Sequence, residues 1–350
     1  MVSKQKTILV TGASGFMGTH IVEEFLSAGY IVRGTVRSEE AALKVRRTFP
    51  DQESRLDLTI VPDMAQAHAF DEAVKDVHGV VHNASPFHTQ VQSNERELLR
   101  PSIDGTTNIL SAVQAHAPDV KRVVLTSSFA AMVDMSLGNR PGHVYSEKDW
   151  NPITYQQAKK ALTPPVLAYT AAKTGAEHAA WDFMQASYPH FDLVTILPAM
   201  VYGPNRNATA NLASLNTSSA DLYRIMSPES KPDDPVPPNV LYSWVDVRDV
   251  AFAHRRAFEV PEAGGNRFFL CEGNFTNQQV ADILRDKLPE LRSRVPVGTP
   301  GSGFEGVDMY KIDHSRSEKV LGVKYHSLEQ TVVDSAKAFL QLEQRMPVVV

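Results

Sequence analysis

The stretch TILVTGASGFMGTHIVEEFL, residues Thr7–Leu26, decides the fold. Apolar and β-branched residues lead into three glycines spaced three apart, Gly12, Gly15 and Gly18, and an amphipathic run follows without a break. This pattern predicts a strand that ends in a tight turn on the N-terminus of a helix. Gly12 permits the turn, Gly15 lets the backbone approach a ligand, and Gly18 lets the helix pack closely on the strand. Such a turn is typical of sites that bind the pyrophosphate of a dinucleotide.

Short runs rich in Val, Ile and Leu alternate with amphipathic runs over the first part of the chain. Nearly continuous apolar strands are buried on both faces, which is typical of a parallel sheet. The alternation therefore predicts an α/β protein with a doubly wound Rossmann sheet. The expected strands are Thr7–Thr11, Tyr30–Val36, Leu58–Val61, Val80–Asn83, Arg122–Ser127 and Leu193–Pro198. The expected helices are Thr19–Ser27, Glu39–Thr48, Phe70–Val77, Glu95–His116 and Val166–Ser187.

The rhythm changes after Pro204, where a polar segment is followed by five prolines between Pro228 and Pro238. Proline at that density resists helix and strand, so this part is expected to be a loop or the edge of a lid. Later elements are a helix capped by Asp246, a strand Arg267–Leu270, a helix capped by Thr276 and a last helix Ser327–Glu343. We expect residues 1–199 to form the Rossmann domain, joined by 241–258. Residues 200–350 would mostly form a smaller C-terminal α/β substrate-binding domain.

Composition excludes several classes of protein. The net charge of −5 and isoelectric point of about 6.2 leave no basic footprint for nucleic acid or an anionic membrane. No apolar run approaches the roughly 20 residues that span a bilayer, and the first one is too short for a signal peptide. The single cysteine, Cys271, excludes an internal disulfide, and the histidines show no metal-binding motif. We expect a cytoplasmic protein without a metal, either a monomer or a homodimer.

The second strand indicates which dinucleotide is bound. A site selective for NAD has Asp or Glu about 20 residues beyond the glycines, where it bonds the ribose 2′-hydroxyl. This chain has Val36 and Arg37 in that region. A guanidinium there pairs well with a 2′-phosphate, and Lys44 is placed to add a second positive charge. The missing acid favours NADP, although Arg37 and Lys44 can also be read as solvated surface residues.

Two further segments carry groups suited to proton transfer. Tyr169 and Lys173 are four residues apart on a predicted helix and therefore share a face. A tyrosine has a reference pKa near 10, and we expect the neighbouring ammonium to lower the pKa of Tyr169. Thr126, Ser127 and Ser128 end a predicted strand, where α/β folds have their ligand sites. A serine hydroxyl there would hold a substrate oxygen beside Tyr169, while one of the two serines only caps the strand end.

The segments TGASGFMG, VVHNASPF, VVLTSS, YTAAK and ILPAMVYGP, in this order, resemble the extended short-chain dehydrogenases/reductases. Within that superfamily the chain is most similar to the carbonyl-reductase branch, which includes dihydroflavonol and cinnamoyl-CoA reductases. The segments ASPF, SEKDWNP and LNTSS resemble most closely the fungal NADPH-dependent methylglyoxal and ketone reductases. The resemblance implies NADPH-dependent reduction of aldehydes and ketones to alcohols.

The resemblance also implies roles for individual residues. Ser128 would bind the carbonyl oxygen, Tyr169 would donate the proton, and Lys173 would activate Tyr169. Phe87 and Phe129 are expected either to form an apolar wall of the substrate pocket or to be ordinary core aromatics. The residues expected at the NADP(H) site are Gly12, Ser14, Gly15, Phe16, Met17, Gly18, Arg37, Lys44, Asp63, Met64, Ala84, Ser85, Pro86, Thr126, Ser127, Tyr169, Lys173, Pro198, Ala199, Val201 and Ser218.

Three other functions stay open at this point. A nucleotide-sugar epimerase or dehydratase of the same fold usually holds NAD through an acid after the second strand, which Val36 and Arg37 disfavour. A non-catalytic NADP-sensing protein commonly loses the tyrosine or lysine, and both are present here. A hydroxysteroid dehydrogenase fits as well, because the pocket residues after Pro204 cannot be read from composition.

Overall fold

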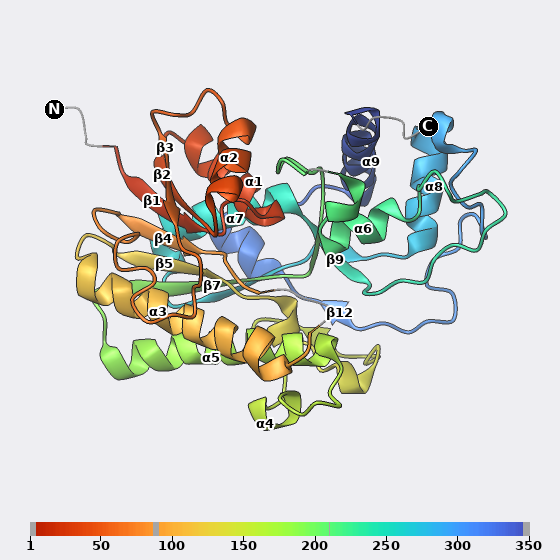
Figure 1. The fold of residues 1–350 in the computed structure, drawn as a ribbon. Coiled ribbons are helices and arrows are strands. Elements are labelled where there is room, and N and C mark those ends of the chain that lie inside the picture. Colours follow the sequence, from red (N-terminus) through yellow and green to blue (C-terminus); the bar gives the residue numbers. More distant parts are fainter. Residues whose placement is uncertain (1–4, 87–90, 210, 346–350) are drawn as a thin grey trace.

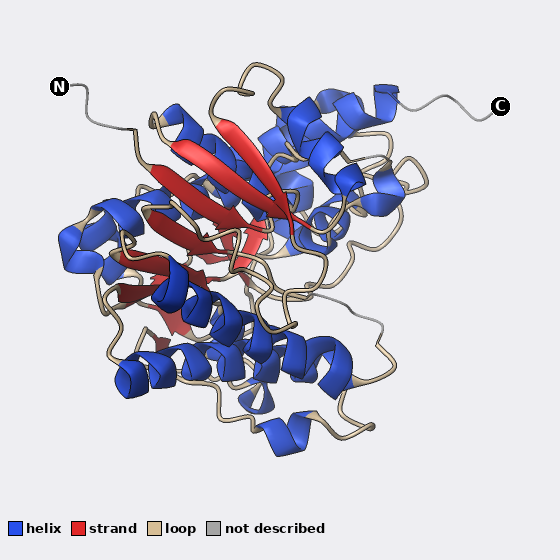
Figure 2. Cartoon of the chain, turned by 60° about the vertical axis from the view of Figure 1, so that its left-hand side comes forward, coloured by secondary structure: helices blue, strands red, loops and turns tan. Residues whose placement is uncertain are grey.

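The computed structural model describes residues 5–86, 91–209 and 211–345. Its centre is a seven-stranded sheet in which every neighbouring pair is parallel, in the order β10-β7-β5-β4-β1-β2-β3 (Figures 1 and 2). The strands are β1 (Thr7–Thr11), β2 (Ile31–Val36), β3 (Leu56–Ile60), β4 (Gly79–His82), β5 (Arg122–Thr126), β7 (Asp192–Pro198) and β10 (Arg267–Leu270). The order reverses between β1 and β4, which is the point where doubly wound sheets bind their ligands.

Helices cover both faces of this sheet, as Figure 2 shows. One face packs against α1 (Phe16–Ser27), α2 (Glu39–Thr48) and α7 (Val247–Glu259), and the other against α3 (Arg100–His116) and α5 (Pro165–Ser187). Side chains alternate along β1, so Ile8 and Val10 join the first core and Leu9 joins the second. The expected Rossmann fold is therefore confirmed.

The chain beyond β7 builds a second core on the right of Figure 1. A three-stranded sheet of β8 (Met200–Tyr202), β9 (Ser243–Asp246) and β11 (Gly273–Asn274) packs with α6 (Thr217–Tyr223), α8 (Asn277–Lys287) and α9 (Leu328–Arg345). The short strands β6 (Val144–Tyr145) and β12 (Lys311–Ile312) pair with each other, and α4 (Tyr155–Ala158) precedes α5. The division at residue 199 stays a prediction, while α7 and β10 lie with the central sheet.

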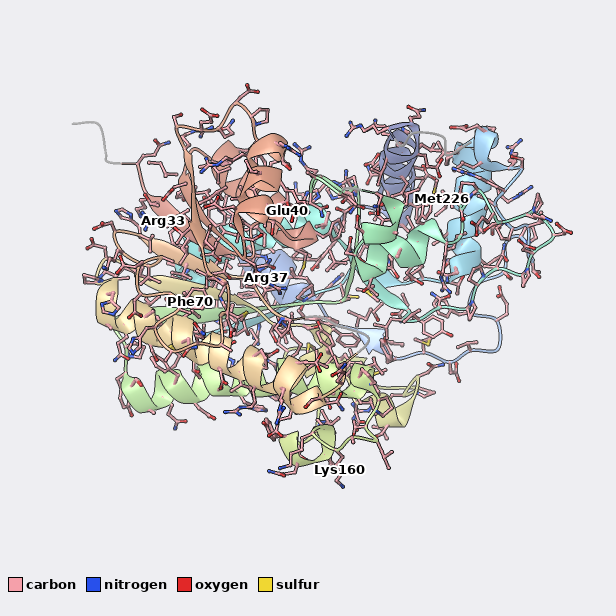
Figure 3. The ribbon with its side chains drawn as sticks, in the orientation of Figure 1. Arg33, Arg37, Glu40, Phe70, Lys160 and Met226 are labelled. Atoms are coloured by element: carbon pink, nitrogen blue, oxygen red, sulfur yellow. The ribbon has the colours of Figure 1, made fainter. Side chains whose placement is uncertain are left out.

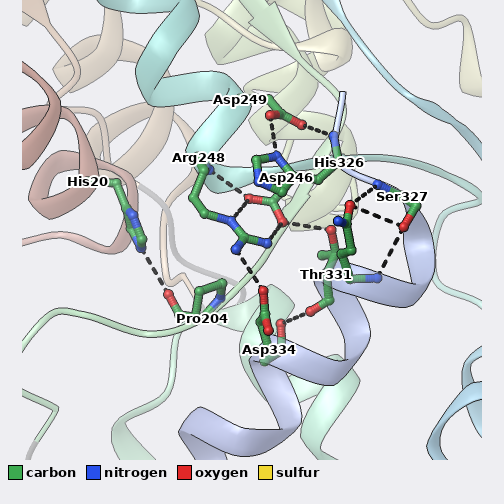
Figure 4. Close-up of polar contacts among 11 residues, drawn as sticks. His20, Pro204, Asp246, Arg248, Asp249, His326, Ser327, Thr331 and Asp334 are labelled. Atoms are coloured by element: carbon green, nitrogen blue, oxygen red, sulfur yellow. Dashed lines mark hydrogen bonds and ion pairs between the residues drawn. The ribbon is translucent and has the colours of Figure 1, made fainter. Parts of the chain in front are cut away.

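The start of α7 is joined to α9 by the ion-pair network around the buried Asp246, which is drawn in Figure 4. Asp246 caps α7 by accepting from the backbone N–H of Arg248, and it pairs with the Arg248 guanidinium at 2.7 Å. Arg248 also pairs with Asp334 of α9 at 2.7 Å, and the Thr331 hydroxyl donates to Asp246 at 2.6 Å. A second pair joins Asp249 to His326 at 2.6 Å. The cap at Asp246 is thus also an anchor for the last helix.

One predicted helix is wrong and another is wrong in part. The segment Phe70–Val77 contains no helix and is built mainly of turns, and His68 before it and Asp76 near its end have positive φ of 67° and 60°. Its apolar residues are buried, so their helical spacing reflects burial by successive turns. The segment Glu95–His116 begins with a π-helical stretch, Glu95–Leu99, before α3. The predicted caps at Asp246 and Thr276 and the strand Arg267–Leu270 are confirmed.

Candidate active site

The glycine turn after β1 is sterically fixed. Gly12 has φ of +70°, a left-handed conformation that favours glycine, and a Cβ there would meet the backbone of Ala84 at 3.1 Å. The N–H of Gly15 donates to the carbonyl of Gly12 at 3.0 Å. A Cβ on Gly18 would lie 2.0 Å from the same carbonyl oxygen, so only glycine lets α1 approach the turn. The turn and the helix therefore form one compact unit at the end of β1.

This unit presents backbone donors at the carboxyl edge of the sheet. The N-cap of α1 is Gly15, which has no side chain to satisfy the N–H groups of the first turn. Thr11 connects the turn to β4, because its hydroxyl oxygen accepts from the N–H groups of Asn83 and Ala84 at 3.0 and 2.9 Å. The buried side-chain oxygen of Asn83 has no partner among the described residues. The free backbone N–H groups at the start of α1, next to the glycine turn, are suited to bind a pyrophosphate.

The end of β2 carries the groups expected at a 2′-phosphate. Arg37, labelled in Figure 3, is exposed. Its side chain forms no hydrogen bond or ion pair within the part of the chain that the structure describes. Ser38 caps α2 through the backbone N–H of Ala41 at 3.3 Å. Lys44 pairs with Glu40 on the same helix at 2.8 Å. The Arg37 guanidinium is thus available to a ligand. Lys44 would have to leave the carboxylate of Glu40 before its ammonium could pair with a phosphate.

The end of β5 and the inner face of α5 bring the predicted catalytic residues together. The ammonium of Lys173 donates to the backbone carbonyl of Thr126 at 2.8 Å. The Ser128 side chain lies next to Tyr169, where it acts to lower the pKa of the phenol. The Ser128 oxygen also accepts from the backbone N–H of Ala130 at 3.1 Å, which fixes the hydroxyl at the start of a short 3-10 turn. Ser128, Tyr169 and Lys173 therefore lie at one place, at the carboxyl edge of the sheet.

Burial sets the protonation state of Tyr169. It raises the pKa of Tyr169 to about 12, and the hydrogen bond with Ser128 acts in the opposite direction. Lys173 is not among the causes of this shift, so the expected lowering of the Tyr169 pKa by Lys173 is not found in the described structure. The phenol consequently keeps its proton at neutral pH, which is the form that a proton donor needs.

Burial also lowers the pKa of Lys173, to about 8, while the nearby Glu177 carboxylate acts to raise it. His82 of β4 is fully enclosed, and burial together with Lys173 lowers its pKa to about 3. This imidazole is neutral at physiological pH. Lys173 is therefore a cation at neutral pH whose charge is lost under mildly alkaline conditions.

The other two hydroxyls of the triplet are bonded inward. The Nδ1 of His254 must donate to the carbonyl of Val250 at 2.7 Å, and burial lowers the pKa of this imidazole to about 4. Its bare Nε2 thus accepts from the Thr126 hydroxyl at 2.7 Å. The Ser127 hydroxyl donates to Glu177 at 2.6 Å. Both hydroxyl hydrogens are used within the protein, and Ser128 is the serine that meets Tyr169.

Comparison with known proteins agrees with this arrangement. Residues 8–271 match the model of the NAD-dependent epimerase/dehydratase family. The chain belongs to this family. It is 39% identical to a ketoreductase of Aspergillus niger, over 97% of this chain and 99% of the relative. It is 34% identical to a cinnamoyl-CoA reductase of Medicago truncatula, over 95% and 94% of the two chains.

A solved structure is similar over the same length. The yeast methylglyoxal/isovaleraldehyde reductase complexed with NADPH is 36% identical to this family member, with a TM-score of 0.88. The match covers 97% of this chain and 100% of the yeast one. The resemblance to fungal reductases of the carbonyl-reductase branch is thereby confirmed.

The remaining predicted cofactor residues lie along the carboxyl edge of the sheet and on the segments that follow it. Asp63 is exposed after β3 and accepts from the backbone N–H of Ala65 at 2.9 Å. Ser218 is buried on α6, where it accepts from the Asn216 amide at 2.8 Å. The others that are buried or half-buried there are Ser14, Phe16, Met17, Met64, Ala84, Ser85, Pro86, Pro198, Ala199 and Val201. Their contacts with a cofactor stay predictions.

The two aromatic residues expected at the substrate pocket have different outcomes. Phe87 lies outside the described residues. Phe129 is 5% exposed and stacks on Phe269 at 5.0 Å, with the edge of Tyr145 at 5.2 Å. This packing agrees with the interpretation of Phe129 as a core aromatic, and its place in the wall of a substrate pocket stays a prediction. Its neighbour Ser128 is the N-cap of the 3-10 turn that begins with Phe129, and its side chain lies next to Tyr169.

Sequence reasoning missed the buried charges behind the site, Glu177 and Arg267, and the buried imidazoles His82 and His254. A signal for Glu177 was present, since it lies four residues after Lys173 and so on the same helix face.

Within the described ranges, no group of three or more His, Cys, Asp or Glu side chains could hold a metal ion. No helix among these residues has the length and hydropathy to cross a membrane.

Proposed function

We propose that this chain is an NADPH-dependent reductase that converts aldehydes and ketones to alcohols. The observation that carries the proposal is that the Ser128 and Tyr169 side chains meet beside the ammonium of Lys173, which is anchored on the carbonyl of Thr126. Relatives similar over nearly the whole chain are named as a ketoreductase and as a methylglyoxal/isovaleraldehyde reductase, the latter solved with NADPH.

The residues at the carboxyl edge of the sheet fit NADPH. The cradle formed by Gly12, Gly15 and the uncapped start of α1 would hold the pyrophosphate. Arg37 would pair with the 2′-phosphate, because it is exposed and unpaired within the described ranges. Lys173 would reach the ribose hydroxyls next to the reacting ring. When bound, NADPH supplies the hydride.

The protein's own groups would manage the charge that develops on the substrate oxygen. The Ser128 hydroxyl donates a hydrogen bond to the carbonyl oxygen and orients it. Tyr169, whose raised pKa keeps the phenol protonated, gives its proton to that oxygen as negative charge builds up. The ammonium of Lys173 stabilises the phenolate that remains. The product is an alcohol whose hydroxyl proton came from Tyr169.

The three alternative functions have less support. The family model is named for epimerases and dehydratases, but two relatives at 34% identity or more that match over almost the full chain are named as a ketoreductase and a cinnamoyl-CoA reductase. An exposed Arg37 in place of an acid disfavours an NAD-dependent sugar enzyme. The complete set of Ser128, Tyr169 and Lys173 disfavours a sensor, and no feature of the described site selects a steroid.

The test is consumption of the reduced cofactor with NADPH and with NADH. The substrates would be methylglyoxal, a branched aliphatic aldehyde, an aryl ketone, a β-keto ester and a steroid ketone. We expect turnover with NADPH well above NADH on the small carbonyl compounds. NADPH binding without any reduction would favour the sensor, tight NAD binding without net turnover the epimerase, and selective turnover of the steroid a hydroxysteroid dehydrogenase. The substrate in the cell would be a small carbonyl compound. The cytoplasmic location and the oligomeric state, monomer or homodimer, stay predictions.

A further inference from the structure

A completely buried carboxylate lies one helical turn beyond Lys173. Glu177 is 0% exposed, and it accepts hydrogen bonds from four side chains. The donors are the Ser127 hydroxyl at 2.6 Å, the Thr195 hydroxyl at 2.8 Å, the Arg267 Nε at 2.8 Å and the Trp181 Nε1 at 3.4 Å. One carboxylate therefore joins α5 to β5, β7 and β10.

The partner of this carboxylate is itself held rigidly. The Arg267 guanidinium donates to the backbone carbonyls of Glu147 and Asp149 at 2.6 and 2.9 Å and lies 3.7 Å from the centre of the Trp150 ring. A buried ion pair is costly to desolvate and is often no more stabilising than well-packed apolar residues. Its position beside the reacting groups therefore points to a role besides stability.

The bond to Ser127 acts on both sides of that residue. Ser128, which follows it, carries the hydroxyl that meets Tyr169. Thr126, which precedes it, carries the carbonyl that accepts from Lys173. Because Glu177 belongs to the same helix as Tyr169 and Lys173, its bond to Ser127 fixes the end of β5 in register with α5.

The charge of Glu177 acts on Lys173 as well. The titratable groups around Lys173 are His82 on β4, His254 behind Thr126 on α7, and Tyr169 on its own helix, and all three are neutral near pH 7. The facing residues of α3, Ser102 and Thr106, are hydroxyls without charge. Arg267 on β10 lies beyond Glu177, with the Glu147 side chain bonded to the backbone of Phe269. Within the described residues, Glu177 is thus the carboxylate that favours the ammonium form of Lys173.

We propose that Glu177 is a positioning residue that holds the end of β5 against α5 through Ser127 and places a negative charge one helical turn from Lys173. This inference rests on the proposed reductase function. It assigns a task at the site to a residue that would touch neither the cofactor nor the substrate.

The decisive variant is Glu177→Gln, which removes the charge at nearly constant shape. We expect the basic limb of kcat/KM for NADPH-dependent reduction to move to lower pH by about one unit, because the opposing charge near Lys173 is gone and Arg267 is left unbalanced. The matched control is Trp181→Phe, which removes one donor to Glu177 and leaves the carboxylate in place. Its basic limb should coincide with that of the wild type.

Two more variants separate charge from position. Glu177→Asp keeps the negative charge, but its shorter side chain moves the carboxylate away from the Ser127 hydroxyl. We therefore expect kcat to fall roughly tenfold, while the basic limb of the kcat/KM pH profile stays where it is in the wild type. Ser127→Ala cuts the link to β5 and should lower kcat similarly while the NADPH dissociation constant changes less than about twofold. If Glu177→Gln does not fold, Ser127→Ala tests the proposal by itself. An unchanged kcat in Ser127→Ala would then overturn the proposal.

The outcomes stay distinct from those of the proposed function. An inactive wild type that binds NADPH contradicts the reductase assignment. If the wild type is active and the pH profile of kcat/KM in Glu177→Gln keeps its shape and is only lower, the inference about Glu177 is contradicted. A purely structural contact would lower activity equally at every pH.

Discussion

At the scale of single residues, burial decides the chemistry of the two titratable groups that the sequence singles out. Tyr169 is pushed toward the phenol and Lys173 toward the neutral amine. The spacing of four residues predicts that they share a helix face, and the structure agrees. The sign of the shift at Tyr169 could not be predicted, because it depends on how much of the ring the rest of the fold encloses.

Tyr169→Phe removes the proton donor without changing the shape of the site. We expect kcat to fall by about 10³-fold, within the range of general acid catalysis, and the NADPH dissociation constant to change less than about twofold. Steady-state kinetics and a fluorescence titration with NADPH measure the two effects. Tyr155→Phe is the control, since its hydroxyl donates to Glu95 at 2.8 Å outside the site. Full turnover in Tyr169→Phe would contradict the assignment.

Arg37→Ala removes the exposed guanidinium at the end of β2. We expect KM for NADPH to rise about 10- to 100-fold with KM for NADH unchanged, because a charge-assisted pair with the 2′-phosphate is lost. Arg47→Ala on α2 also removes an exposed arginine and should leave both constants unchanged. Equal increases for the two cofactors in Arg37→Ala would exclude Arg37 from the phosphate site.

Lys173 makes stability depend on pH without cofactor. Its folded pKa of about 8 lies below the usual 10.5, so between these values the unfolded chain binds a proton that the folded chain lacks. Stability from this group therefore rises with pH in that window. Relative to Lys173→Met, the wild-type free energy of unfolding should gain about 2 kcal/mol from pH 7.5 to 9.5.

Urea unfolding at the two pH values measures this gain. Lys160→Met, at an exposed lysine far from the sheet in Figure 3, should show no pH-dependent difference from the wild type. A constant difference between wild type and Lys173→Met would mean that Lys173 titrates as a solvated lysine does.

At the scale of elements, strands and caps could be predicted more reliably than helices. Arg267–Leu270 and the caps at Asp246 and Thr276 follow from local composition, and local interactions form them. Phe70–Val77 has the spacing of a helix, but the chain forms turns there, with positive φ at His68 before the segment and at Asp76 near its end. Phe129 follows the catalytic triplet, yet tertiary stacking buries it. The spacing of apolar residues indicates which side of a segment is buried. The contacts made by the rest of the fold determine whether that segment is a helix or a series of turns.

The link between α7 and α9 gives a prediction at this scale. Asp246→Ala removes a helix cap and leaves the Arg248 guanidinium short of one carboxylate. We expect a loss of about 3 kcal/mol in the free energy of unfolding. The bonds to Arg248 and Thr331 lower the pKa of Asp246, so its stabilisation is present above the usual range of Asp and lost as pH falls through the folded value.

Denaturant unfolding at neutral pH measures this loss. Asp286→Ala, at a carboxylate whose side chain is 70% exposed, is the control and should change stability by less than about 0.5 kcal/mol. A loss in Asp246→Ala no larger than in this control would show that the network in Figure 4 adds nothing to stability.

At the scale of the whole molecule, the segment after β8 is fastened to the helix that follows the glycine turn. His20 of α1 donates to the carbonyl of Pro204 at 2.9 Å, and Glu23 pairs with Arg206 at 2.6 Å. The part of the chain after β7 is thus connected to the unit that would hold the pyrophosphate. The sequence indicates both parts, but residues 184 positions apart carry no local signal of their contact.

Transfer of a deuterium label tests the proposed reduction at its reacting atoms. NADPH with both hydrogens at C4 of the nicotinamide replaced by deuterium would be incubated with the enzyme and methylglyoxal or a branched aldehyde, and the product analysed by mass spectrometry and NMR. We expect an alcohol with deuterium on the former carbonyl carbon, formed by the wild type and almost absent with Tyr169→Phe. NADPH that binds but transfers no label to any carbonyl compound would contradict the proposed function.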